Sequence, residues 1–124
     1  MPKYTFLAFT NPTSPDKEAE FNAWYDEHHV PDVLNVPGFV SGRRFRLAKS
    51  QFPFNTQEPT HRYLALYEIE TDDLAASLNE IVARAGTADM VMIDAMDMST
   101  LNAPVYEEIV PAVQAEDVQR PRRA

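Results

Sequence analysis

The residues best suited to chemistry lie in one stretch, residues 21–39, which holds two of the three histidines and the only tryptophan. His28 and His29 are adjacent, and Trp24 and Tyr25 precede them by about one helical turn. An imidazole titrates near neutral pH and can accept or donate a proton, while a tyrosine hydroxyl can bind a substrate oxygen. This stretch therefore predicts general acid–base chemistry by His29 or His28, assisted by Tyr25.

These side chains are expected to lie on a helix that starts at Ser14 and Pro15 and ends near His29, because Pro31 follows. At about 100° per residue, the inward stripe of such a helix holds Phe21, Trp24, Tyr25 and His28. His29 lies at the edge of that stripe. Helical phase therefore favours His28 as the inward histidine.

The remaining elements are predicted from apolar periodicity and turn residues. Alternation predicts strands at residues 3–9, 39–47, 62–70 and 99–109. A second helix is expected between a cap at Thr71-Asp72-Asp73 and a left-handed cap at Gly86, with Leu74, Leu78, Ile81, Val82 and Ala85 inward. The order βαββαβ predicts an α+β fold, a ferredoxin-like sandwich with a four-stranded antiparallel sheet and two helices on one face.

Four methionines gather between the second helix and the last strand, at Met90, Met92, Met96 and Met98. We expect an irregular segment there, because methionine fills uneven apolar gaps and also lines adaptable ligand pockets. Residues 48–61 are expected to form a long connection between strands.

Length and patterning predict one domain, residues 1–112, followed by a polar tail, residues 113–124. The first strand carries apolar residues on both faces, with Tyr4, Phe6 and Ala8 on one and Leu7 and Phe9 on the other. Two helices can cover only one face of a sheet. We therefore expect a homodimer that covers the second face.

The composition excludes several classes of function. A net charge of -8 disfavours nucleic acid as a partner, because binding to phosphates relies on clustered lysine and arginine. No apolar run is long enough to span a membrane, so no membrane partner is expected, and a cytoplasmic location is the default. With three glycines there is no glycine-rich phosphate loop, and with no cysteine there is no thiolate site.

No metal or other cofactor is expected. Adjacent His28 and His29 point about 100° apart on a helix, whereas helical metal ligands prefer a spacing of three or four residues. The pair His28 and Asp32 has that spacing, but Pro31 interrupts it. For haem, the sequence carries no specific signal.

The segment from Trp24 to Leu34, followed by Val36-Pro37-Gly38-Phe39, resembles the signature of EthD-like proteins in the dimeric α+β barrel superfamily. The later segment 61–68 and the helix after Thr71-Asp72-Asp73 are similar to the same group, so the resemblance covers most of residues 3–110. It implies that His29 is the functional histidine. The superfamily includes cyclases, isomerases, cofactor-free oxygenases, haem-handling enzymes and inactive members, so the reaction stays open.

Helical phase and the resemblance thus disagree about which histidine faces inward. A helix that ends at Val30-Pro31 commonly unwinds in its last turn, which would swing His29 toward the sheet. We therefore place His29 first and His28 second. Burial among aromatic rings lowers the pKa of a histidine and a nearby carboxylate raises it, so the sign of the shift stays open at this point.

A pocket is expected between the first helix and the sheet. Its substrate-binding residues are expected to be Trp24, Phe45, Tyr63, Tyr67, Arg44, Met90 and Met96. An arginine in strand 39–47 can bind a substrate carboxylate, although pairing with Glu68 or Glu70 on a neighbouring strand is the commoner use.

The expected function is a cofactor-independent lyase, isomerase or cyclase-type step on an apolar or aromatic oxygenated metabolite, in a catabolic or secondary-metabolic pathway. One alternative is a non-catalytic ligand-binding or accessory protein of a degradation pathway, in which the histidines only cap the helix. The other is a cofactor-free or haem-type monooxygenase.

Overall fold

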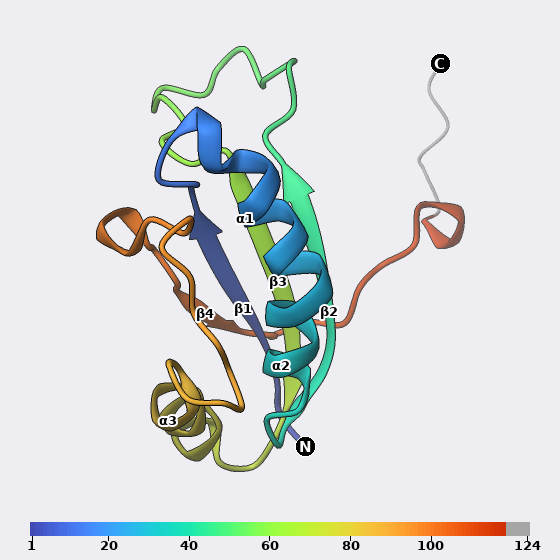
Figure 1. The fold of residues 1–124 in the computed structure, drawn as a ribbon. Helices are drawn as coiled ribbons and strands as arrows, with labels where there is room; N and C mark the ends of the chain where they lie inside the picture. The colour runs from blue at the N-terminus through green and yellow to red at the C-terminus, as the bar shows by residue number, and fades with distance from the viewer. Residues whose placement is uncertain (119–124) are drawn as a thin grey trace.

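The computed structural model describes residues 1–118 and contains one four-stranded antiparallel sheet in the order β2-β3-β1-β4 (Figure 1). The strands are β1 (Lys3–Thr10), β2 (Phe39–Arg46), β3 (Tyr63–Glu70) and β4 (Val105–Glu107). This order confirms the ferredoxin-like α+β fold expected from the sequence. The end of the predicted tail, residues 119–124, lies outside the described residues.

One long helix crosses the face of the sheet and is built from three segments (Figure 1). They are α1 (Glu18–Trp24), a π-helical turn (Tyr25–His29) and α2 (Val30–Leu34), after a short 3-10 turn (Pro15–Lys17). The prediction that Pro31 ends this helix is wrong. The π turn ends at His29, and a new α-helical segment, α2, begins at Val30. Pro31 lies in the first turn of this segment, where a backbone N–H is not needed for a hydrogen bond within the segment.

The start of this helix also differs from the prediction. Ser14 precedes the 3-10 turn with Pro15 next to it, but the Ser14 side chain makes no capping hydrogen bond. Asp73, in contrast, caps α3 (Leu74–Arg84) by accepting a hydrogen bond from the Ala76 N–H at 3.1 Å. Gly86 follows α3 at a φ of 85°, as expected for a left-handed cap.

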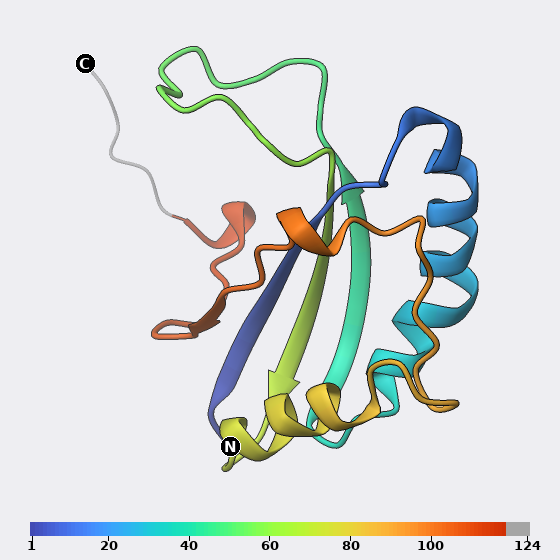
Figure 2. The same ribbon diagram turned by 60° about the vertical axis from the view of Figure 1, so that its left-hand side comes forward.

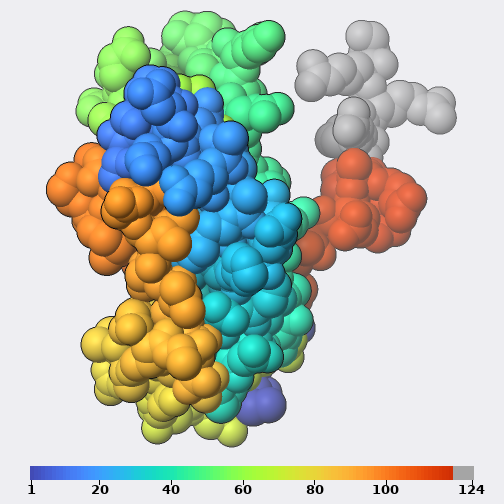
Figure 3. Space-filling view, viewed as in Figure 1, coloured from blue at the N-terminus to red at the C-terminus, as the bar shows by residue number. Residues whose placement is uncertain are grey.

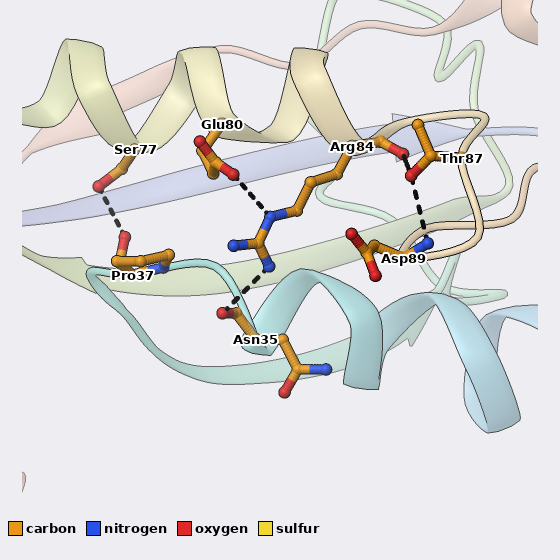
Figure 4. Close-up of polar contacts among 7 residues, drawn as sticks. All are labelled: Asn35, Pro37, Ser77, Glu80, Arg84, Thr87 and Asp89. Atoms are coloured by element: carbon orange, nitrogen blue, oxygen red, sulfur yellow. Dashed lines mark hydrogen bonds and ion pairs between the residues drawn. The ribbon is translucent and has the colours of Figure 1, made fainter.

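Helix α3 lies at the end of the sheet near the N-terminus and does not run along the sheet face (Figure 2). Two polar contacts hold it to the segment after α2: the Ser77 hydroxyl donates to the Pro37 carbonyl at 2.8 Å, and Arg84 donates to the Asn35 carbonyl at 3.3 Å (Figure 4). The expectation of two helices covering one face is therefore corrected. Residues 87–104, which are mostly irregular, take the place of the second helix.

The core lies between the sheet and the long helix. The β3 side chains that face the helix are all buried: Tyr63, Ala65, Tyr67 and Ile69. A β-bulge between Phe39 and Ser41 changes the phase of β2. Phe39 therefore faces the helix together with Gly42 and Arg44, whereas Phe45 faces the opposite side of the sheet.

The opposite face of the sheet is less well covered. Leu7, Phe9, Leu64 and Leu66 are only partly buried there, and Phe45 is exposed. Residues 108–118 leave the body as an arm (Figure 3), which carries exposed Ile109 and Val113. Among the described residues, no helix is long and apolar enough to cross a membrane.

Candidate functional site

An apolar cavity of about 280 Å³ lies between the sheet, the π turn, α3 and the methionine-rich segment. Its lining comes from four parts of the chain: β1 and β3, the π turn with α2, α3, and residues 90–103. The lining residues are Phe6, Ala8, Tyr25, His29, Val33, Tyr67, Ile81, Val82, Ala85, Met90, Met92, Met96, Met98, Leu101 and Ala103.

His29 is the histidine that reaches the cavity. It is 9% exposed, whereas His28 is exposed to solvent and does not line the cavity. The π turn is the cause, because it adds one residue to a helical turn and shifts every later side chain by one place. His29 and Val33 thereby take the inward positions that a regular α-helix would give to the residues before them.

The ring of His29 is held by two aromatic neighbours. It stacks on Trp24 with a centroid distance of 4.5 Å and an interplanar angle of 21°. It also meets the Tyr25 ring edge to face at 5.0 Å. Trp24 is fixed in turn, because its Nε1 donates to the Val91 carbonyl at 2.9 Å and ties the helix to the methionine-rich segment.

Burial decides the protonation state of His29. It lowers the pKa of the imidazole from 6.5 to about 4, and the positive charge of Arg44 acts in the same direction to a smaller extent. Among residues 1–118 no carboxylate pairs with the ring, and Nδ1 is buried without a hydrogen-bond partner there. At neutral pH His29 is therefore an uncharged imidazole.

Tyr25 separates the cavity from Arg44. The Arg44 guanidinium lies over the Tyr25 ring at 4.4 Å from its centroid, and it bonds Asp26 at 2.8 Å and Asn22 at 2.9 Å. Burial raises the pKa of the Tyr25 hydroxyl, and the nearby Thr10 hydroxyl and Arg44 oppose that rise. Among residues 1–118, Thr10 Oγ1 makes no hydrogen bond of good geometry. Tyr25 is therefore a neutral phenol.

Tyr67 is the second aromatic hydroxyl of the cavity wall. The hydroxyl oxygen of Tyr67 is buried and has no hydrogen-bond partner among residues 1–118. Burial, and to a smaller extent the neighbouring Tyr25, raises the pKa of this hydroxyl far above its usual range. The Tyr67 ring packs on the bare backbone of Gly42, where an added Cβ would lie 2.8 Å from the ring. A side chain at residue 42 would push Tyr67 away, so this glycine is needed for the close approach.

The structure brings together only part of the predicted site. His29, Tyr25, Tyr67, Met90 and Met96 all line the cavity. Trp24 does not line the cavity, and instead stacks on the ring of His29. The expected position of Phe45 is corrected, because the β2 bulge turns it to the opposite face of the sheet.

Tyr63 and Arg44 belong to a separate, open polar cleft that they share with Asn22, Asp26, Phe45 and Arg46. The Tyr63 hydroxyl donates to Glu18 at 2.7 Å, and Arg44 pairs with Asp26. The expected pairing of an arginine in strand 39–47 with Glu68 or Glu70 is absent among the described residues. The reason is the same bulge, which aims Arg44 at the helix.

Sequence reasoning missed the residues that close the cavity from α3 and from the segment before β4. Ile81 and Ala85 had been expected as plain core, and Leu101 and Ala103 carried no signal of their own. Their role depends on α3 lying at the sheet end, which the 3.6-residue periodicity of a helix cannot reveal.

Within residues 1–118 no group of three or more histidine, cysteine or acidic side chains is placed to hold a metal ion. The polar side chains that line the cavity are one imidazole and two phenols, which can transfer protons and form hydrogen bonds.

Neither a protein-family model nor a curated protein matches this sequence. Solved structures with a similar fold include the haem degrader MhuD from Mycobacterium tuberculosis with two haems in its active site, at a TM-score of 0.59 and 17% identity, covering 89% of this chain and 99% of that one. An arginine-to-serine variant of MhuD with two manganese protoporphyrin IX per active site has a TM-score of 0.52 and 20% identity, covering 91% and 100%. An EthD family protein from Bacillus halodurans has a TM-score of 0.48 and 17% identity, covering 88% and 100%. The MhuD likenesses establish the ferredoxin-like α+β fold for this chain.

Proposed function

We propose that this protein is a small-molecule enzyme in which His29 transfers protons on an apolar or aromatic oxygenated metabolite, without a cofactor. The observation that carries the proposal is the position of His29, a neutral imidazole that lines an apolar cavity and whose Nδ1 has no hydrogen-bond partner among residues 1–118. The resemblance to EthD-like proteins points to the same histidine. A catabolic or secondary-metabolic role and a cytoplasmic location remain predictions.

The low pKa of His29 favours one kind of step within the lyase, isomerase and cyclase classes. A neutral imidazole can accept a proton from a carbon next to a carbonyl. Because the resulting imidazolium is disfavoured in this buried position, it returns the proton quickly. Return to a different atom of the same ligand is an isomerisation, which is the step this geometry supports best.

The porphyrins of the two MhuD structures make haem-type oxygenation an alternative to consider. The cavity here does not fit a haem. Its volume of about 280 Å³ lies at the low end for ligand pockets, and its lining includes no lysine or arginine to pair with the haem propionates. We therefore derive no haem chemistry for this chain.

A non-catalytic ligand-binding protein is the second candidate. The observation that favours it is again the pKa of about 4, because a general base works best when its pKa is near the operating pH. In this alternative His29 only hydrogen-bonds the ligand.

A proton-exchange assay separates the two candidates. Acetophenone and propiophenone carry exchangeable protons beside a carbonyl, and deuterium uptake from D₂O can be followed by NMR with and without protein. We expect the wild type to speed exchange and His29→Ala to lose this effect by about a hundredfold or more, the usual contribution of a general base.

His28→Ala is the matched control, because His28 neighbours His29 but lies in solvent. It should exchange at the wild-type rate. Ketone binding without any protein-dependent exchange would favour the binding protein, and equal exchange by wild type and His29→Ala would remove His29 from the mechanism.

We also propose that the chain forms a homodimer. Its support is the uneven cover of the sheet, whose second face keeps Leu7, Phe9, Leu64 and Leu66 only partly buried. The arm at residues 108–118 adds exposed apolar side chains outside the body. A second copy would bury both surfaces at once.

A further inference from the structure

We propose that the cavity selects an uncharged ligand whose carbonyl oxygen accepts a hydrogen bond from the Tyr67 hydroxyl, and that it rejects carboxylates of the same size. This inference rests on the proposed function in one respect, because it takes the cavity at His29 to be the ligand site. It adds the charge class of the ligand and the residue that reads it.

The hydroxyl of Tyr67 is the first observation. Tyr67 is 2% exposed, lines the cavity, and has a hydroxyl oxygen that is buried without a protein partner. Buried hydroxyls in proteins are almost always hydrogen-bonded, and one left unpaired is destabilising. A ligand oxygen that accepts this hydrogen bond would remove that cost.

The Tyr67 side chain is also held rigidly by the residues around its ring. Its ring meets Phe6 edge to face at 6.0 Å and Phe39 at 5.9 Å, and it rests against Gly42. The phenol stays protonated throughout the physiological range. It therefore acts as a fixed hydrogen-bond donor.

The charge of the lining is the second observation. None of the residues that line the cavity is a lysine, arginine, aspartate or glutamate. Arg44, the cation whose charge acts on His29, lies across the Tyr25 ring and is already bonded to Asp26 and Asn22. A carboxylate that entered the cavity would lose its hydration and find no counter-charge, which is strongly unfavourable.

The volume limits the size of the ligand. A water molecule occupies about 30 Å³ of liquid, so a cavity of about 280 Å³ has room for roughly nine waters. That space suits a ligand of one or two rings. The apolar lining and the stacked His29 and Trp24 rings favour an aromatic one.

Three probes of matched size test this inference: acetophenone, ethylbenzene and benzoate, titrated into the protein with Kd measured by NMR shift changes. We expect the ketone to bind about tenfold more tightly than the hydrocarbon, the value of one hydrogen bond to a buried hydroxyl. Benzoate should bind at least about a hundredfold more weakly than acetophenone.

The Tyr67→Phe variant should bind acetophenone no more tightly than ethylbenzene, with the ethylbenzene Kd unchanged. Tyr63→Phe is the control, because the Tyr63 hydroxyl bonds Glu18 outside the cavity. It should keep the wild-type preference. An unchanged ketone preference in Tyr67→Phe, benzoate binding as tight as acetophenone, or no binding of either neutral probe would each overturn the inference.

These measurements need no turnover, so they fail separately from the proposed function. Selective ketone binding without proton exchange would uphold Tyr67 and the neutral ligand while removing catalysis by His29. Proton exchange with equal binding of the three probes would uphold catalysis by His29 and remove the role of Tyr67 in selecting a neutral ligand.

Discussion

His29 is a histidine that the fold keeps uncharged. It is packed between Trp24 and Tyr25, and the positive charge of Arg44 disfavours its protonation. A protein interior that held His29 only for packing could use an apolar residue at lower cost, because a buried polar nitrogen without a partner is destabilising. This cost is a reason to assign the residue a function.

The lowered pKa of His29 predicts an acid-sensitive fold. The unfolded chain binds a proton at His29 below pH 6.5, whereas the folded protein binds it only below about pH 4. This contribution to the free energy of unfolding is complete above pH 6.5 and is lost as the pH falls toward 4. We expect a loss of up to about 3 kcal/mol from this group alone.

Urea unfolding at several pH values between 7 and 4 measures this effect. His29→Gln should be less dependent on pH across that window, while His28→Gln, altered at the exposed neighbour, should follow the wild type. Parallel curves for wild type and His29→Gln would show that His29 does not resist protonation in the folded state.

Sequence reasoning at the residue scale placed His29 before His28, but it expected the helix to unwind before Pro31 and did not foresee the π turn that brings His29 inward. The choice depended on whether the helix was regular, and neither histidine carries a local signal of a π turn. Phe45 was misplaced for a similar reason, since a bulge of one residue reverses the faces of all later positions in a strand.

At the scale of elements, the π turn and Pro31 depend on each other. The Val30 N–H donates to the Tyr25 carbonyl across the wide turn, and Pro31 lies in the first turn of the next helical segment, α2. Without the extra residue, Pro31 would fall in the interior of one continuous α-helix, where proline costs about 3 kcal/mol or more.

Deleting the exposed residue Glu27 should therefore destabilise the protein by roughly that amount. Combining the deletion with Pro31→Ala should restore most of the stability, because a continuous α-helix then becomes possible with His29 still inward. Urea unfolding of wild type, deletion, Pro31→Ala and the double variant tests this coupling. Equal stability of the deletion with and without Pro31→Ala would show that the π turn has another cause.

The whole molecule was the easiest level to predict. The order of strands and helices follows from apolar periodicity and capping residues, and the observed sheet order is the one expected for βαββαβ. The position of α3 was not predictable, because it is set by long-range contacts such as Ser77 to the Pro37 carbonyl. The cavity exists only because α3 lies at the sheet end.

The proposed dimer is a prediction at this scale. Replacing Leu66, on the partly buried second face of β3, by glutamate should convert the dimer to a monomer at micromolar concentration. Ala23→Glu, on the exposed side of α1, should leave the dimer intact. Size-exclusion chromatography with light scattering measures the mass, and a monomeric wild type would refute the proposal.

The π turn also affects how this chain should be compared with distant relatives. A helix that lacks the extra residue has one position fewer between the aromatic pair Trp24-Tyr25 and the inward histidine. A gapless alignment would then match that histidine to His28, which is exposed. The two sites align only when a one-residue gap is placed inside a helix, where alignment methods penalise gaps most. At 17–20% identity, an alignment can therefore fail to match His29 to the corresponding histidine of a relative.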